Sequence, residues 1–100
     1  MKLVVLDAAA AELNAAVEWY EQKQVGLGED LLLEAGRVLA TIAERPLAFP
    51  LAPNSQIVRR SLFKRFPYAA YFVIAKERVS VMAFGHARRR PGYWRSRLPH

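Results

Sequence analysis

The stretch that decides the fold is residues 57–85, IVRRSLFKRFPYAAYFVIAKERVSVMAFG, where apolar side chains recur with a period of about two. Such a period is typical of β-strands. We expect three strands, over residues 57–63, 68–75 and 78–85, separated by turns at 64–67 and 76–77. In the last strand both faces are largely apolar. This predicts a central strand covered on both sides, by helices on one side and by a partner on the other.

The N-terminal half has the longer period of helices. Residues 8–24 contain neither Gly nor Pro, and their apolar positions form one stripe: Leu13, Ala16, Val17 and Tyr20. A second stripe runs from Leu31 through Ala35, Val38 and Leu39 to Ile42 and ends before Pro46. The intervening Gly26-Leu27-Gly28 predicts a tight turn, so the two helices form an antiparallel hairpin.

A short apolar run at residues 3–6 predicts a first strand, with Asp7 capping the helix that follows it. The proline-rich residues 46–56 connect the helical half to the strand half. Residues 1–100 therefore form a single α+β domain with the order β-α-α-β-β-β. Glu12, Glu18 and Glu21 lie mostly off the apolar stripe, where we expect solvent.

Charge is divided unequally between the two halves. Residues 1–50 hold four basic and eight acidic side chains, a balance of −4, whereas residues 51–100 hold eleven basic side chains and one acid, Glu77, a balance of +10. Such a division predicts one electropositive surface in the C-terminal half and an acidic or polyanionic partner.

Several classes of protein are excluded or disfavoured by composition. The chain has no cysteine, which excludes disulfides and thiolate metal sites, and His86 and His100 have no ligand partner at a useful spacing. No phosphate-binding glycine loop or supported nucleophilic serine is present, so we expect neither metal nor cofactor. The short apolar start is not a signal peptide and no stretch is long enough to span a membrane. We expect a soluble, cytoplasmic protein.

The remaining candidates for function are basic and aromatic. Arg59 and Arg60 are adjacent on a strand, so their side chains point to opposite faces. Residues 86–97 carry five arginines, one histidine and two aromatic residues. Arginine binds phosphate or carboxylate bidentately and aromatic rings stack on bases. The expected target-binding residues are Arg59, Arg65, Arg88, Arg89, Arg90, Tyr93, Trp94 and Arg97. For Tyr93 and Trp94 the alternative, which we favour, is that they pack the C-terminal segment against the sheet.

A set of short motifs resembles a known family. They are Ala11-Glu12-Leu13, Trp19-Tyr20-Glu21, Gly26-Leu27-Gly28, Phe49-Pro50, Arg65-Phe66-Pro67-Tyr68 and His86-x-x-Arg89-x-Pro91-x-Tyr93-Trp94-x-x-Arg97. In this order and spacing they resemble the RelE/ParE toxin superfamily, the plasmid-stabilisation proteins, over nearly the whole chain. The resemblance implies a helical hairpin packed on a small twisted antiparallel sheet, the order of elements that periodicity also indicates.

The two branches of that family imply different functions. RelE-like members cleave mRNA on the ribosome without metal, and ParE-like members inhibit DNA gyrase. This chain has Ala69 and Ala87 where RelE-like sequences carry basic residues, although Tyr93 occupies the position of the RelE tyrosine. The resemblance is therefore closest to the ParE branch.

The leading hypothesis is a ParE-like toxin of a type II toxin–antitoxin system, a basic protein that inhibits DNA gyrase without catalysis. A cognate antitoxin would neutralise it in a hetero-oligomer through an acidic amphipathic segment. One alternative is a RelE-like, metal-independent endonuclease acting on mRNA at the ribosome, with His86, Arg89, Tyr93 and Arg97 as its catalytic set. A further alternative is a nucleic-acid-binding protein without toxicity.

Overall fold

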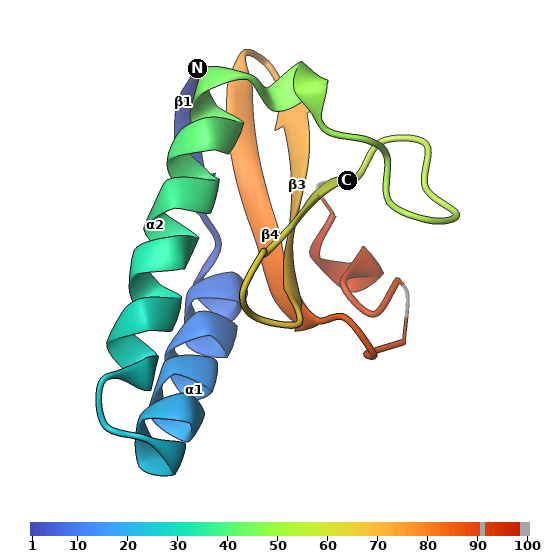
Figure 1. Ribbon diagram of the computed structural model, residues 1–100. Helices are drawn as coiled ribbons and strands as arrows, with labels where there is room; N and C mark the ends of the chain where they lie inside the picture. The colour runs from blue at the N-terminus through green and yellow to red at the C-terminus, as the bar shows by residue number, and fades with distance from the viewer. Residues whose placement is uncertain (91, 99–100) are drawn as a thin grey trace.

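The computed structural model describes residues 1–90 and 92–98 and contains one helical hairpin and one four-stranded sheet. The hairpin covers one face of the sheet, and the segment after the last strand lies on the other face (Figure 1). The strand order across the sheet is β1-β4-β3-β2. The predicted α+β class and order of elements are confirmed.

The two helices begin and end close to the predicted positions. Helix α1 spans Asp7–Lys23 and helix α2 spans Leu27–Glu44, followed by a short 3-10 helix, η1, at Pro46–Ala48. Both apolar stripes face the sheet. Gly26 has a φ of 92°, a left-handed conformation that glycine adopts without a steric cost, and this allows the tight turn.

Acidic side chains at the helix ends act differently from the prediction. Asp7 is the first helical residue, Leu6 occupies the N-cap position, and no side chain caps α1. Glu21 is not a purely solvent-facing residue, because its carboxylate accepts hydrogen bonds from the backbone N–H groups of Gly26 (3.0 Å) and Gly28 (3.0 Å). Glu21 thereby satisfies donors at the start of α2 that the helix itself leaves unpaired.

The sheet consists of an antiparallel meander with one added parallel strand. Strands β2 (Arg59–Leu62), β3 (Tyr68–Ala75) and β4 (Arg78–His86) pair antiparallel in sequence order. Strand β1 (Lys2–Val5) pairs with β4 in parallel, from Lys2 beside Arg78 to Val5 beside Val81. The sheet is therefore mixed rather than wholly antiparallel, since the hairpin returns the chain to the end of the sheet where β1 began.

Strand β4 is buried on both faces, as its sequence predicts. Val79, Val81 and Phe84 belong to the core beneath the helices, whereas Met82 and Ala83 belong to a second core with Trp94. A β-bulge opposite Tyr71 and Phe72 allows two consecutive residues of β4 to face the second core. The second face is thus covered by the chain's own C-terminal segment, not by the partner that we expected there.

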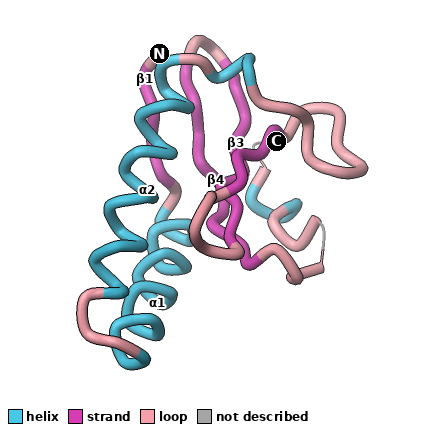
Figure 2. Tube along the Cα trace, viewed as in Figure 1, coloured by secondary structure: helices cyan, strands magenta, loops and turns pink. Residues whose placement is uncertain are grey.

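The C-terminal segment and the loop before β2 lie on the same side of the sheet, away from the helices (Figure 2). Trp94 is 2% exposed and packs on Tyr71, with 5.6 Å between the ring centroids. Ala52 and Val58 from the loop complete this second core. Within residues 1–90 and 92–98, no helix is both long and apolar enough to cross a lipid bilayer.

Candidate functional site

The first part of the site lies along an open edge of β4. Because β1 ends at Val5, the half of β4 that follows Val81 has no strand beside it on that side. Unpaired backbone groups at a buried position must find other partners. The carboxylate of Glu12 accepts a hydrogen bond from the N–H of Phe84 (3.2 Å), and the guanidinium of Arg97 donates to the carbonyl of Met82 (3.0 Å).

Glu12 also joins the C-terminal segment to α1. Its Oε1 lies 2.7 Å from Nη1 of Arg97, and its Oε2 lies 3.1 Å from Nη1 of Arg89. The side chain of Glu12 is 15% exposed and that of Arg97 22%, whereas Arg89 is about half exposed. Partial burial strengthens the Glu12–Arg97 pair relative to a surface ion pair.

Tyr93 completes this cluster beneath Arg89. The guanidinium carbon of Arg89 lies 3.7 Å from the centroid of the Tyr93 ring, a cation–π contact. The hydroxyl of Tyr93 is buried against Gly85, where a Cβ would come within 2.5 Å of it, and it forms no hydrogen bond within the described part of the chain. Only glycine fits at position 85 with this packing.

The ionisation of the cluster follows from burial and from Glu12. Burial, together with the negative charge of Glu12, raises the pKa of Tyr93 far above its usual value. Burial also raises the pKa of Tyr68, with smaller effects from Tyr20 and Glu12. The hydrogen bond with Glu12 raises the pKa of Arg97. Tyr93 is therefore neutral and Arg97 charged over the physiological range of pH.

The structure brings together three residues of the expected catalytic set, with Glu12 at their centre. Arg89 and Arg97 both bind Glu12, and Tyr93 lies under both guanidinium groups. His86 stands at the end of β4 against Tyr68, and its Nδ1 accepts a hydrogen bond from the N–H of Arg88 (3.1 Å). A buried neutral tyrosine and a carboxylate that neutralises two arginines are poorly suited to stabilise a phosphorane.

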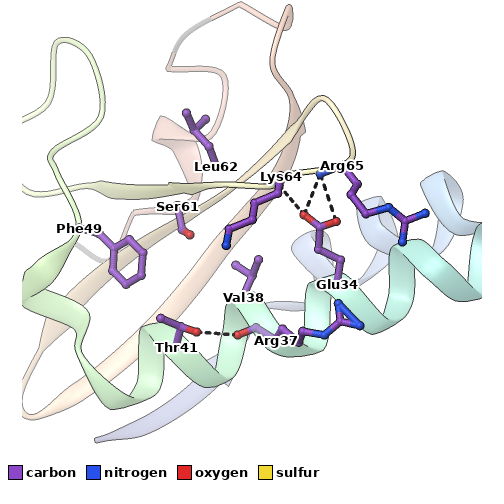
Figure 3. A pocket seen from close by; sticks show the side chains of 9 residues that line it. All are labelled: Glu34, Arg37, Val38, Thr41, Phe49, Ser61, Leu62, Lys64 and Arg65. Carbon is purple, nitrogen blue, oxygen red and sulfur yellow. Dashed lines mark hydrogen bonds between the residues drawn. The ribbon is translucent and has the colours of Figure 1, made fainter.

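The second part of the site is a groove between α2 and the edge strand β2, with a cavity volume of about 470 Å³ (Figure 3). Val38 and Phe49 form its apolar wall, and Arg37, Lys64 and Arg65 supply positive charge. The groove thus combines apolar surface with basic groups, as an acidic amphipathic peptide segment requires.

Glu34 fixes the wall of this groove. It is 7% exposed, and its carboxylate accepts hydrogen bonds from the backbone N–H groups of Lys64 and Arg65 (3.3 Å to the latter) (Figure 3). Arg65 also pairs with Asp30 at 3.3 Å, with both side chains substantially exposed. These contacts hold the turn between β2 and β3 against α2.

The third part of the site is a small hollow on the outer face of the sheet, with a volume of about 40 Å³. Arg60 and Arg89 are its charged lining residues, and the remaining walls are supplied by Ala52, Pro53, Tyr71, Ala87, Gly92 and Trp94. Arg95 lies beside it, donating from Nη2 to the carbonyl of Asn54 (3.2 Å). Arg59 points to the opposite face and donates to the carbonyl of Phe49 (2.6 Å), so the prediction that Arg59 and Arg60 diverge is confirmed.

The expected target-binding residues fall into two groups. Arg65, Arg88, Arg89 and Arg90 are exposed. Trp94 is buried in the second core, Tyr93 lies under the guanidinium groups of Arg89 and Arg97, Arg97 is held by Glu12, and Arg59 is tied to the loop before β2. The packing role of Trp94 is confirmed, and its expected target-binding role is wrong, because its indole is buried and not available to stack on a target. Pro91 and His100 lie outside the described residues.

Sequence reasoning missed Glu12 and Glu34. Glu34 lies three residues after Leu31, within the buried stripe of α2, and Glu12 lies three residues after the buried Ala9. An acid at a core position of a helix indicates a buried partner elsewhere in the chain, and this signal could have identified both. Among residues 1–90 and 92–98 no group of three or more metal-ligating side chains is present.

The comparisons with known proteins point to one fold. No protein-family model matches the chain. No curated protein matches it either. Among solved structures, the chain is similar to one titled "Chromosomal ParDE TA system from P. aeruginosa", with a TM-score of 0.64 and 19% sequence identity over 86% of this chain and 95% of that one. The α+β architecture of this chain is thus a ParE-like fold.

Proposed function

We propose that this protein is the toxin of a type II toxin–antitoxin system, that it is ParE-like, and that it acts by binding and inhibiting DNA gyrase. The observation that carries the proposal is the likeness, over 86% of the chain, to the fold found in a structure titled as a ParDE TA system. The basic surfaces of the C-terminal half support it, because they suit contact with a macromolecule rather than chemistry on a small molecule.

We propose further that a cognate antitoxin neutralises the toxin by placing an acidic amphipathic segment in the groove between α2 and β2. The apolar wall at Val38 and Phe49 would receive the apolar side chains, and Arg37, Lys64 and Arg65 would receive the acids. Strand β2 is also the outermost strand of the sheet. Its backbone after Arg60 is therefore open to pairing with an added segment.

The contacts of Glu12 weigh against the endonuclease alternative. Tyr93 is buried, and its raised pKa opposes the loss of its proton, so it is a poor general base. Arg97 already neutralises a carboxylate of the protein itself. Both features favour a binding role for the C-terminal segment.

Induced expression in bacteria and supercoiling assays with purified gyrase test the proposal. We expect growth arrest with DNA damage and filamentation, inhibition of gyrase by the purified protein, and rescue of growth by the product of an adjacent antitoxin gene. Arg89→Ala should weaken toxicity more than Lys2→Ala, since Lys2 lies on the far edge of the sheet. Unchanged gyrase activity at saturating protein would refute the gyrase target, and rapid loss of translation with cut messages would favour the endonuclease.

A further inference from the structure

We infer that the hollow on the outer face of the sheet is a binding site for the phosphodiester backbone of a nucleic acid. Its role in toxicity rests on the proposed function, whereas the binding itself does not. The groove between α2 and β2 lies toward the helices and the hollow lies on the opposite face, so the two sites can be occupied independently.

The charge around the hollow favours an anion. Both charged residues that line it, Arg60 and Arg89, are arginines, and no acid is among its lining residues. Glu12 pairs with Arg89 from outside the hollow, so the uncompensated charge there is that of Arg60. The guanidinium of Arg60 forms no hydrogen bond or ion pair within residues 1–90 and 92–98, although its backbone N–H donates to the carbonyl of Pro50. A half-buried guanidinium without an acidic partner leaves a positive potential directed at the hollow.

The hollow is also supported by packing contacts and is of a suitable size. Trp94 and Tyr71 pack against each other beneath it, and the Glu12 carboxylate and the Tyr93 ring fix the position of Arg89. A volume of about 40 Å³ holds roughly three water-sized groups. This is room for the oxygens of one phosphate and too little for a large apolar side chain.

The surroundings distinguish a nucleic acid from an acidic peptide. Arg88, Arg89 and Arg90 form an exposed run beside the hollow, and Arg95 lies on its other side over Gly92. These exposed arginines add positive charge next to the hollow, which favours a ligand with repeated negative charges such as a phosphodiester backbone. An amphipathic peptide needs a broad exposed apolar wall, whereas here the largest apolar residue, Trp94, is 2% exposed and the exposed apolar lining residues, Pro53 and Ala87, are small.

Fluorescence anisotropy with the purified full-length protein tests the site, using a short fluorescein-labelled DNA duplex and a single-stranded RNA of the same sequence as probes. Arg60→Gln and Arg95→Gln are the test variants. Arg78→Gln is the matched control, because it removes the same charge from an exposed position at the opposite end of β4. Thermal melts of all variants establish that each is folded.

We expect Arg60→Gln to weaken binding of the nucleic acid about fivefold. It should also reduce, by about one, the magnitude of the negative slope of the logarithm of the binding constant against the logarithm of the salt concentration. Arg78→Gln should leave both close to the parent values. If the DNA duplex binds more tightly than the single-stranded RNA, DNA is the source of the phosphodiester. If the RNA binds more tightly, RNA is the source. Both results support the site. Equal effects of Arg60→Gln and Arg78→Gln, or equally Arg60-dependent binding of polyglutamate, would overturn it.

The outcome is separable from that of the proposed function. If neither nucleic acid binds but expression still arrests growth and gyrase is inhibited, the phosphodiester site is wrong and the proposed toxin function stands. If binding depends on Arg60 but expression has no effect on growth, the site stands and the toxin function falls.

Discussion

Tyr93 shows how a single residue in the C-terminal segment is controlled by its surroundings. Its ring supports the guanidinium of Arg89, and its hydroxyl is enclosed beside Gly85 without a hydrogen bond within residues 1–90 and 92–98. Burial removes the hydration of this hydroxyl, and the nearby carboxylate of Glu12 disfavours the loss of its proton. Its contribution is therefore the packing of the ring rather than chemistry at the oxygen.

Alkaline unfolding tests this environment. The pKa of Tyr93 in the folded protein is raised above the unfolded value of 10.0, so the unfolded chain loses its proton first as the pH rises. Stability is therefore fully present below pH 10 and falls above it. We expect Tyr93→Phe to lose less stability at alkaline pH than the parent. Part of the loss should remain, because the pKa of Tyr68 is shifted in the same direction.

The measurement is urea unfolding at neutral pH and above pH 10. At neutral pH Tyr93→Phe should equal or exceed the parent in stability, since the substitution removes an unpaired buried hydroxyl. Tyr71→Phe keeps Tyr93 and serves as the control. If Tyr93→Phe loses as much stability at alkaline pH as the parent does, the hydroxyl of Tyr93 is not buried as described.

At the scale of elements, the open half of β4 determines how the C-terminal segment docks. Strand β1 is four residues long and pairs only as far as Val81. Glu12 from α1 and Arg97 from the C-terminal segment take the place of a neighbouring strand by binding the backbone of Phe84 and Met82. One carboxylate thus connects a helix, a strand and the C-terminal segment.

Removal of that carboxylate should loosen the segment. We expect Glu12→Ala to lower the free energy of unfolding by about 2 kcal/mol, because it leaves the partly buried Arg97 and the N–H of Phe84 without their acceptor. This corresponds to a decrease in Tm of about 10 °C for a chain of this size. Limited trypsin digestion should also cleave after the arginines of residues 88–97 more rapidly.

Glu18→Ala is the matched control on the same helix, because it removes the same charge from an exposed side chain. It should change stability by less than about 0.5 kcal/mol. Equal losses of stability and equal digestion rates in the two variants would mean that Glu12 does not hold the C-terminal segment.

At the scale of the whole molecule, the sheet separates two basic surfaces of different character. The groove toward α2 combines Val38 and Phe49 with Arg37, Lys64 and Arg65, whereas the hollow on the other face is lined by arginines over a buried indole. Under the function proposed above, this division would let the antitoxin and the target bind to separate surfaces.

A substitution in the groove should therefore separate neutralisation from toxicity. Leu62 lines the groove and is 58% exposed. We expect Leu62→Asp to weaken binding of the cognate antitoxin roughly tenfold, because the added charge repels an acidic segment, while growth arrest persists. Isothermal titration and co-expression rescue provide the readouts.

Leu47→Asp introduces the same charge at an exposed position of η1 that does not line the groove. It should leave antitoxin binding unchanged. If both variants bind the antitoxin equally well, the groove is not the neutralisation surface.

The sequence by itself determined the helical hairpin, the meander of β2, β3 and β4, and the concentration of positive charge in the C-terminal half. Periodicity, glycine positions and local charge balance depend on residues close together in the sequence, so they can be recognised without a structure. The expected divergence of Arg59 and Arg60 followed from the same local geometry.

Only the tertiary structure decided which arginines are exposed for contact with another molecule and which bind groups of the protein itself. The pair of Glu12 and Arg97 joins positions 85 residues apart, and the contact of Glu34 with the backbone of Arg65 spans 31. Such contacts arise because packing places a buried carboxylate next to unpaired backbone donors and cations from a distant part of the chain. The parallel addition of β1 and the burial of Trp94 likewise depend on tertiary packing, since each brings together segments that are far apart in the sequence.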